Sequence, residues 1–209
     1  MAAFLGNLRN VVIAGFVLAL IILGIRLSYG GLDLGGEAFW AFAVRWAHIL
    51  CGVMWIGLLW YFNFVSTPTT PQIPADLRPA LGKYITPAAL FWFRWGAMGT
   101  IVFGLILAWM NGYLAQALSL DSYDDGGSFK TPSYLLIGIG MWLGIIMWFN
   151  VWFLIWPNQQ KALNIGGKYP DLSAEAKAAA AKTSGMFSRI NTLLSIPMLF
   201  CMAAASHMP

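Results

Sequence analysis

The chain has 209 residues, of which 59% are hydrophobic and 10% are charged, and its formal net charge is +4. A mean hydropathy of +0.70 excludes an ordinary soluble domain and is typical of a protein that crosses a membrane several times. The two cysteines form no CxxCH motif, which excludes a covalently attached c-type haem within these residues.

Five segments are apolar and long enough to cross a bilayer as helices, because a hydrocarbon core of ~30 Å needs ~20 mostly apolar residues. The first follows Arg9, as the apolar part of a signal peptide does. No small-x-small cleavage site follows it in LSYGGLDLGG, so we expect a retained anchor. The sequence predicts an all-α integral membrane helical bundle, one transmembrane domain over 1–209, with spans at about 10–29, 39–65, 89–112, 133–156 and 187–207.

Basic residues divide unequally between the loops on the two sides of this predicted bundle. The far side holds Arg26 and Lys130 beside several acidic residues, whereas the side of the N-terminus holds Arg9, Arg78, Lys83, Lys161, Lys168, Lys177, Lys182 and Arg189. The positive-inside rule then predicts a bacterial inner (cytoplasmic) membrane protein with a cytoplasmic N-terminus and a periplasmic C-terminus.

The connections and glycines add detail to this bundle. Residues 66–79, STPTTPQIPADLRP, are rich in proline and predict an extended or turn-rich cytoplasmic loop. Residues 171–185, DLSAEAKAAAAKTSG, predict a short cytoplasmic helix with Ser173 as its N-cap. Within the spans, two pairs of glycines have a spacing that allows helices to approach closely: Gly96 with Gly99, and Gly140 with Gly144.

Polar residues inside the predicted spans sort by depth into two layers. Near the periplasm lie Arg45, His48 and His207, and toward the cytoplasm lie Asn63, Arg94, Asn150 and Asn191, with Asn158 and Gln159 just past the end of the fourth span. No predicted span contains Asp or Glu, so the two arginines have no acidic partner there. Each arginine extends to the membrane surface, binds backbone carbonyls, or pairs with an anion that is not part of the chain.

The histidines suggest a redox centre. His48 and His207 each lie 17 residues from the cytoplasmic end of a span, which places both rings at a height of ~25 Å. Neutral imidazole is a good ligand for haem iron. We therefore expect His48 and His207 to hold a haem b and Arg45, three residues before His48, to meet a haem propionate. The alternative is a hydrogen-bonded core histidine at 48 and an interfacial one at 207.

Four stretches of the chain resemble, in the same order, the membrane domain of the bacterial cytochrome c-linked urate oxidases, the PuuD-type family. They are WAHILCGVMWIGLLWYFNFVSTP, ALFWFRWGAM, FNVWFLIWPNQQKAL and NTLLSIPMLFCMAAASH. The resemblance implies oxidation of urate to 5-hydroxyisourate, with electrons passed to a cytochrome c. Full-length members continue into a C-terminal cytochrome c domain, which is not found in these 209 residues. The implied acceptor is then a separate cytochrome c or a quinone.

The resemblance implies a role for the polar layer on the cytoplasmic side. Urate is a planar anion with amide-like edges, so Arg94, Asn63, Asn150 and Asn191 are candidates to bind it. No residue is assigned as the general base. The alternative function is a non-catalytic accessory subunit of a respiratory or photosynthetic complex. Transport of an anion is a third interpretation. The expected partners are the lipid bilayer, a cytochrome c or another membrane electron-transfer complex, and a small anion such as urate, but no nucleic acid.

Overall fold

A computed structural model describes residues 2–31, 33–120 and 132–207. Over these residues the chain forms helices and no strands. Five helical runs within them have the length and apolar composition to cross a membrane: Leu8–Ser28, Glu37–Gln72, Arg78–Met110, Tyr134–Leu163 and Ala174–Ser206. The predicted fold class, an all-α membrane bundle with five spans, is therefore confirmed. The N-in/C-out orientation stays a prediction.

The chain divides into two compact units, Met1–Phe42 and Ala43–Pro209, and each is described by itself. The first contains α1 (Ala2–Leu5), α2 (Leu8–Ser28) and the first turns of α3. At the start of α2 the side chain of Asn7 accepts a hydrogen bond of 3.0 Å from the Arg9 backbone N–H. At its end Arg26 donates to the Gly30 carbonyl over 2.9 Å. The apolar middle of α2 thus lies between two helix ends that are both capped.

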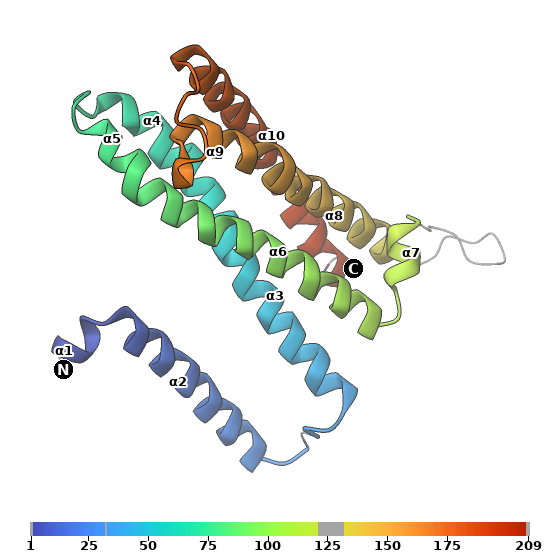
Figure 1. Cartoon of the computed structure of the whole chain (residues 1–209). Coiled ribbons are helices and arrows are strands. Elements are labelled where there is room, and N and C mark those ends of the chain that lie inside the picture. The colour runs from blue at the N-terminus through green and yellow to red at the C-terminus, as the bar shows by residue number, and fades with distance from the viewer. Residues whose placement is uncertain (1, 32, 121–131, 208–209) are drawn as a thin grey trace. The chain divides into compact units, whose positions relative to one another are not determined.

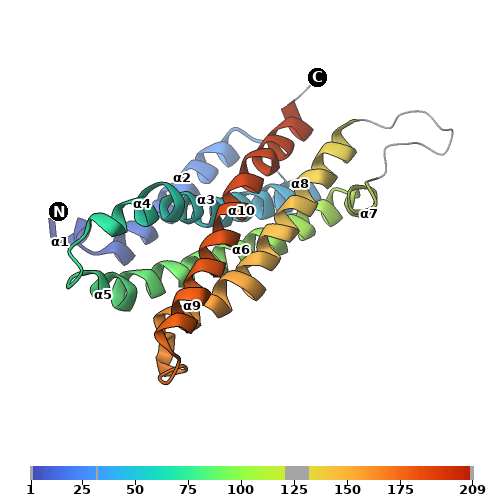
Figure 2. The ribbon, with the colours of Figure 1, turned by 90° about the horizontal axis from the view of Figure 1, so that it is seen from above.

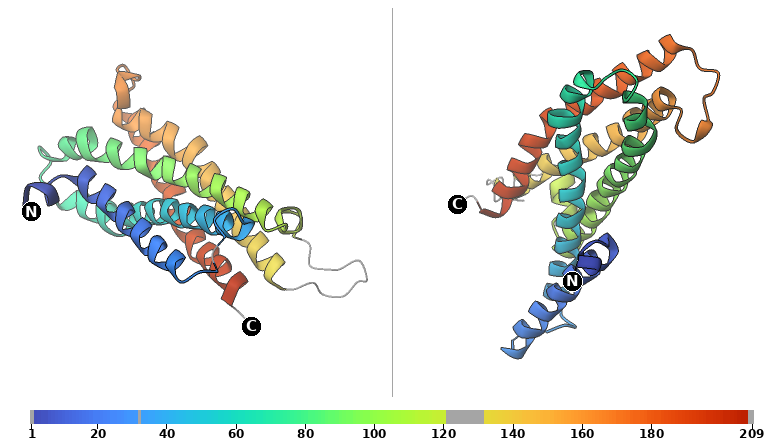
Figure 3. Two further views of the ribbon diagram at one scale, coloured as in Figure 1. Left: turned by 90° about the horizontal axis from the view of Figure 1, so that it is seen from below. Right: turned by 90° about the vertical axis from the view of Figure 1, so that its left-hand side faces the viewer.

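The second unit is built on four long helical runs (Figure 1). Its elements are α3 (Glu37–Trp60), η1 (Tyr61–Ser66), α4 (Thr67–Thr69), η2 (Thr70–Gln72), α5 (Arg78–Ala80), η3 (Leu81–Ile85), α6 (Thr86–Met110), α7 (Leu114–Leu118), α8 (Pro132–Phe149), η4 (Asn150–Ile155), α9 (Trp156–Leu163), η5 (Ile165–Gly167) and α10 (Ala174–His207). The bend between α9 and α10 lies at the same end of the unit as α4 and α5 (Figure 3). Seen from above, α8 runs alongside α10, and the two helices are in extensive contact (Figure 2).

Three of these runs contain a widened π-helical turn, at η1, η3 and η4. A proline follows each turn closely: Pro68, Pro87 and Pro157. Proline has no N–H for the usual helical bond, and its ring collides with the carbonyl four residues earlier. That carbonyl belongs to Phe64, Lys83 or Phe153, which lies inside the π turn in each case. The prolines therefore account for the wide turns.

Small residues let the helices of the second unit pack closely. A Cβ on Gly96 would lie 3.2 Å from the Trp55 backbone nitrogen, so α6 meets α3 there. A Cβ on Gly140 would lie 3.0 Å from Cys201 Cβ, so α8 meets α10. Gly144 faces α6 instead, where a Cβ built on it would lie 3.8 Å from Ile101 Cδ1. The predicted close approach is confirmed, but Gly140 and Gly144 serve different partners.

Two predicted connections differ from the structure. Residues 66–79 are largely helical, because α3 continues through η1 and α4 to Gln72 and a new helix begins at Arg78. The predicted short helix over 171–185 is the beginning of α10 and is continuous with the last span. Ser173 does cap this helix, since its Oγ accepts a hydrogen bond of 3.2 Å from the Ala176 N–H.

Candidate functional site

The second unit contains a groove of about 780 Å³. It lies at the end where α3 passes into α4, where α6 begins and where α10 begins. Two cations line it, Lys182 and Arg189, and they lie seven residues apart on one face of α10. No acidic side chain is among the described residues that line it. The groove is therefore electropositive.

Amide and hydroxyl groups line the same groove and are partly engaged with one another. Asn63 donates from Nδ2 to the Leu59 carbonyl at 2.9 Å and to Ser188 Oγ at 2.8 Å. Gln159 donates from Nε2 to Ser184 Oγ at 2.8 Å. These bonds fix the orientation of both amides and use only their nitrogens. Within the described residues no donor contacts the amide oxygen of either residue. The groove thus offers fixed acceptors beside its two cations.

Aromatic rings form the apolar wall of the groove. Phe62 of η1 and Phe93 of α6 both line it, and their ring centroids lie 5.9 Å apart at an interplanar angle of 89°. Phe62 and Asn63 are exposed to the groove from the π turn η1, and Ile155 reaches it from the π turn η4. The proline-widened turns therefore supply part of the lining, and π turns are frequent at functional sites.

Arg94, predicted to bind substrate, does not line the groove. Its guanidinium carbon lies 3.6 Å from the ring centroid of Trp156 and 5.1 Å from that of Trp152. Cation–π contacts of this kind contribute ~2 kcal/mol when they are shielded from water. They explain how the span holds a cation without an acidic partner. Its buried Nε has no hydrogen-bond partner among the described residues.

Asn150 and Asn191, the other two predicted substrate ligands, are buried and bonded to each other. Asn150 donates from Nδ2 to Asn191 Oδ1 at 2.8 Å, and Asn191 donates from Nδ2 to the Met147 carbonyl at 2.9 Å. Neither residue lines the groove. Of the four residues predicted to bind urate, the structure brings only Asn63 to the groove, and the pair at 150 and 191 ties η4 to α10.

His48 lines a second, smaller cavity of about 50 Å³ between α3, α6, α8 and α10. Its Nδ1 lies 2.8 Å from the Thr100 carbonyl oxygen. A carbonyl only accepts, so Nδ1 carries the proton and Nε2 keeps its lone pair. Gly104 makes room for the ring, because a Cβ there would lie 3.0 Å from His48 Cε1. The imidazole is therefore held in the tautomer that binds a metal through Nε2.

The other residues of the predicted redox centre are Arg45 and His207. Arg45 is exposed, one turn before His48. Burial raises the pKa of Tyr113, and the nearby Arg45 charge opposes this rise. His207 is the last residue of α10, and its side chain lies outside the part of the chain that is described. Its pairing with His48 therefore stays a prediction.

A haem can be tested against the cavity beside His48. The protonated Nδ1 and free Nε2 suit an iron ligand. Cofactor pockets, however, enclose ~300–1,000 Å³, whereas this cavity has about 50 Å³. The chemistry of His48 fits the predicted haem b, but the cavity does not fit the macrocycle.

Several groove residues were not among the predicted site residues: Phe62, Phe93, Gln159, Lys182, Ser188 and Arg189. Lys182 and Arg189 were used only as charges of the N-terminal side, because Lys182 precedes the predicted span 187–207 and Arg189 lies at its start. The sequence did hold a signal for them. No proline separates the alanine-rich run 174–181 from the span, so one helix can carry both cations, seven residues apart.

Comparisons with protein-family models, with curated proteins and with solved structures found no match for this chain.

Proposed function

We propose that this chain is a urate oxidase-like oxidoreductase of the membrane, which binds urate in the groove. In the reaction, urate gains the oxygen of one water molecule as a hydroxyl group and loses two electrons and two protons, which gives 5-hydroxyisourate. The electrons pass to a separate cytochrome c or to a quinone. The PuuD-type resemblance supplies the reaction, and the groove supplies the place where the substrate would bind.

The observation that carries the proposal is the complementary chemistry of the groove and urate. Urate has a delocalised negative charge and carbonyl oxygens, which Lys182 and Arg189 suit as cationic donors. Its ring N–H groups need acceptors, and the amide oxygens of Asn63 and Gln159 are available. Its flat face suits the rings of Phe62 or Phe93. A volume of about 780 Å³ leaves room for a small planar molecule and water.

This assignment revises the set of substrate residues. It keeps Asn63, and it replaces Arg94, Asn150 and Asn191 with Lys182, Arg189 and Gln159. The groove lies at the basic end of the bundle, which the positive-inside rule assigns to the cytoplasm, where purine catabolites occur. Electrons would then leave toward the periplasmic side.

Membranes that contain the chain test the proposal directly. They are mixed with urate and either oxidised cytochrome c or a short-chain quinone, and reduction of the acceptor is followed by absorbance. Wild type is expected to show urate-dependent reduction. Arg189→Gln and Lys182→Gln should each raise KM by roughly tenfold or more, since a hydrogen bond to a charged group contributes ~1.5–3 kcal/mol.

Lys177→Gln is the matched control, because Lys177 lies on the same helix and does not line the groove. Its KM should remain that of wild type. If wild type reduces neither acceptor and also fails to bind urate in equilibrium dialysis, the proposal is wrong. Co-purification with a respiratory or photosynthetic complex, without turnover, would then favour the accessory-subunit alternative.

A further inference from the structure

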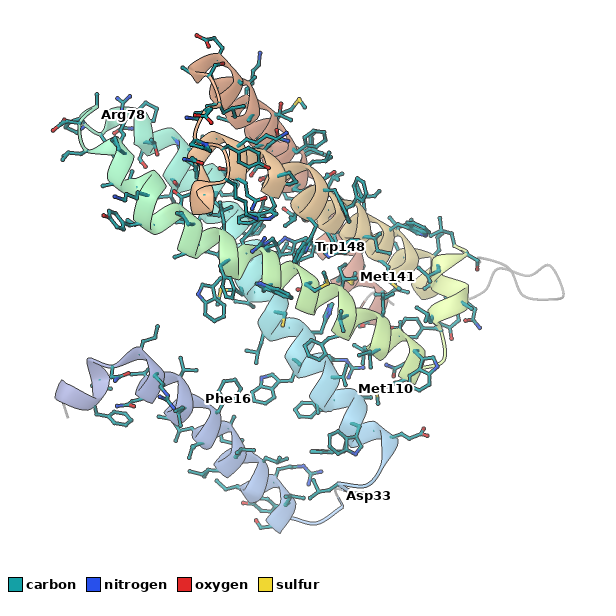
Figure 4. All side chains as sticks on the ribbon, viewed as in Figure 1. Phe16, Asp33, Arg78, Met110, Met141 and Trp148 are labelled. Carbon is teal, nitrogen blue, oxygen red and sulfur yellow. The ribbon has the colours of Figure 1, made fainter. Side chains whose placement is uncertain are left out.

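We infer that the small cavity beside His48 is a binding site for a monovalent copper ion, a role separate from urate binding in the groove. Three methionines line this cavity together with His48: Met141 from α8, and Met198 and Met202 from α10. Met198 and Met202 are four residues apart and therefore lie on one face of their helix. Figure 4 shows Met141 extending from α8 into the middle of the unit.

His48 presents a prepared nitrogen ligand to this cavity. Its Nδ1 proton is held by the Thr100 carbonyl at 2.8 Å, which fixes the ring and leaves the Nε2 lone pair unused within the described residues. Such a bond to a backbone carbonyl is the usual way in which a protein orients a metal-binding histidine. The hydroxyl of Thr100, which also lines the cavity, donates to the Gly96 carbonyl at 2.8 Å and is therefore engaged elsewhere.

The ligand set selects a soft ion. Thioether sulfur and imidazole nitrogen favour copper in its monovalent state, whereas calcium, magnesium and manganese need oxygen ligands. No carboxylate lies among the described residues that line the cavity. All the ligands are neutral, so the charge of the ion stays uncompensated in a low-dielectric interior. Because that cost rises with the square of the charge, it is about four times smaller for a monovalent ion than for a divalent one.

The size of the cavity agrees with an ion and not with a larger group. Its volume of about 50 Å³ accommodates a single ion or one to two waters. A buried water normally needs two to four polar partners. Here the polar side chains of the lining are those of His48, Thr100 and Trp55, and the Thr100 hydroxyl already donates to the Gly96 carbonyl.

Two glycines leave room for the ligand side chains. A Cβ on Gly104 would lie 3.0 Å from His48 Cε1, and one on Gly140 would lie 3.2 Å from Met202 Cε. Both contacts are tighter than ordinary packing. The absence of side chains at these two positions therefore lets the imidazole and the Met202 thioether reach the same cavity from opposite helices.

The test uses the full chain in detergent with its methionine methyl groups labelled with carbon-13. Copper(I) is added without oxygen, and silver(I) serves as a mimic that does not change oxidation state. One ion is expected to bind per chain, in competition with a copper(I) chelator. Of the ten methionine methyl signals, only those of Met141, Met198 and Met202 are expected to shift.

Leucine substitutions separate ligation from packing, because leucine has a volume close to that of methionine. Met198→Leu and Met202→Leu should each weaken copper(I) binding by about tenfold or more, and His48→Gln by at least as much. Met147→Leu is the matched control: Met147 is a fully buried methionine of α8, the helix that carries Met141, but does not line this cavity. It should bind copper(I) as wild type does.

Circular dichroism reports whether each variant is folded, and Met141→Leu replaces His48→Gln if the latter is not. Copper(I) affinity that is unchanged in the Met198→Leu, Met202→Leu double variant overturns the inference. Methyl shifts at other methionines, or no bound ion in wild type and only water in the cavity, also overturn it.

Discussion

Two groups of polar side chains in the second unit differ in whether their N–H groups find acceptors within the chain. The side-chain amides of Asn63, Asn150, Gln159 and Asn191 all donate to carbonyl or side-chain oxygens of the chain. In contrast, Arg94 Nε and the indole nitrogens of Trp55, Trp148 and Trp152 are buried N–H donors without acceptors in the described residues. Trp148 is labelled in Figure 4.

This difference shows which buried N–H donors the bundle supplies with hydrogen-bond acceptors of its own. A buried donor without an acceptor costs ~1–3 kcal/mol, and more if it is charged. The amides avoid that cost through partners that include Ser184, Ser188 and Asn191 of α10. The arginine and indole donors do not, and Arg94 is compensated by the rings of Trp152 and Trp156. The amides therefore stabilise the fold, whereas Lys182 and Arg189 line the groove without a partner among the described residues.

The largest effect is expected for Trp55, one of the buried N–H donors without an acceptor in the described residues. Trp55 is fully buried, lines the small cavity and belongs to the same buried cluster as Phe93 of the groove. Trp55→Ala should lower the free energy of unfolding by about 3–5 kcal/mol through the void it leaves. Thermal unfolding in detergent measures this. Trp109→Ala, at a position that is 70% exposed, is the control and should change stability little.

Breaking the amide pair should have the next largest effect. Asn191→Leu removes the acceptor of Asn150 and leaves the buried Asn150 amide without a hydrogen bond. The free energy of unfolding should therefore fall by about 1–3 kcal/mol. The double change Asn150→Leu, Asn191→Leu strands no donor and should cost less than the single change. Equal losses in both variants would mean that packing, and not the hydrogen bond, joins η4 to α10.

The third prediction asks whether Arg94, which contacts tryptophan rings, takes part in substrate binding. Because it does not line the groove, Arg94→Gln should leave KM for urate within about twofold of wild type, while Arg189→Gln raises it roughly tenfold. Steady-state reduction of cytochrome c or quinone measures both variants. A tenfold rise in KM for Arg94→Gln would return Arg94 to the substrate site.

The smallest effect concerns Tyr113, which lies just outside the spans. Burial raises the pKa of its phenol and the charge of Arg45 opposes that rise, so Arg45→Gln should raise this pKa further. The folded state favours the neutral phenol, and its contribution to stability is therefore present below the ordinary pKa of 10.0 and is lost as pH rises above it. The difference between the ultraviolet titrations of each protein and its Tyr113→Phe variant isolates this group.

Most of the fold could be predicted from the sequence, because spans of about twenty apolar residues identify themselves by length and composition. The ends of the spans could not. Ala174–Ser184 is polar enough to be assigned to the cytoplasm, yet it continues the helix of the last span. Hydropathy marks where lipid ends, and not where a helix ends.

The candidate site was predictable only in part, because the sequence does not show which neighbour a side chain contacts. Residue type and depth selected Asn63, Asn150 and Asn191 alike, because they do not distinguish an amide that lines a groove from one bonded to a neighbouring helix. Asn150 and Asn191 needed the packing of η4 against α10 to be recognised as partners. The copper ligands were hidden because methionine is an ordinary core residue, and only their convergence on one cavity sets these three apart.

The wide turns at Tyr61–Ser66, Leu81–Ile85 and Asn150–Ile155 have a consequence for comparing this chain with others. Each holds one residue more than a regular helix needs, and each residue advances a helix by about 100°. A chain shortened by one residue in such a turn would keep the same hydropathy profile while everything on one side of it rotated. Alignments therefore need their single-residue gaps at these turns, or they will match side chains that point in different directions.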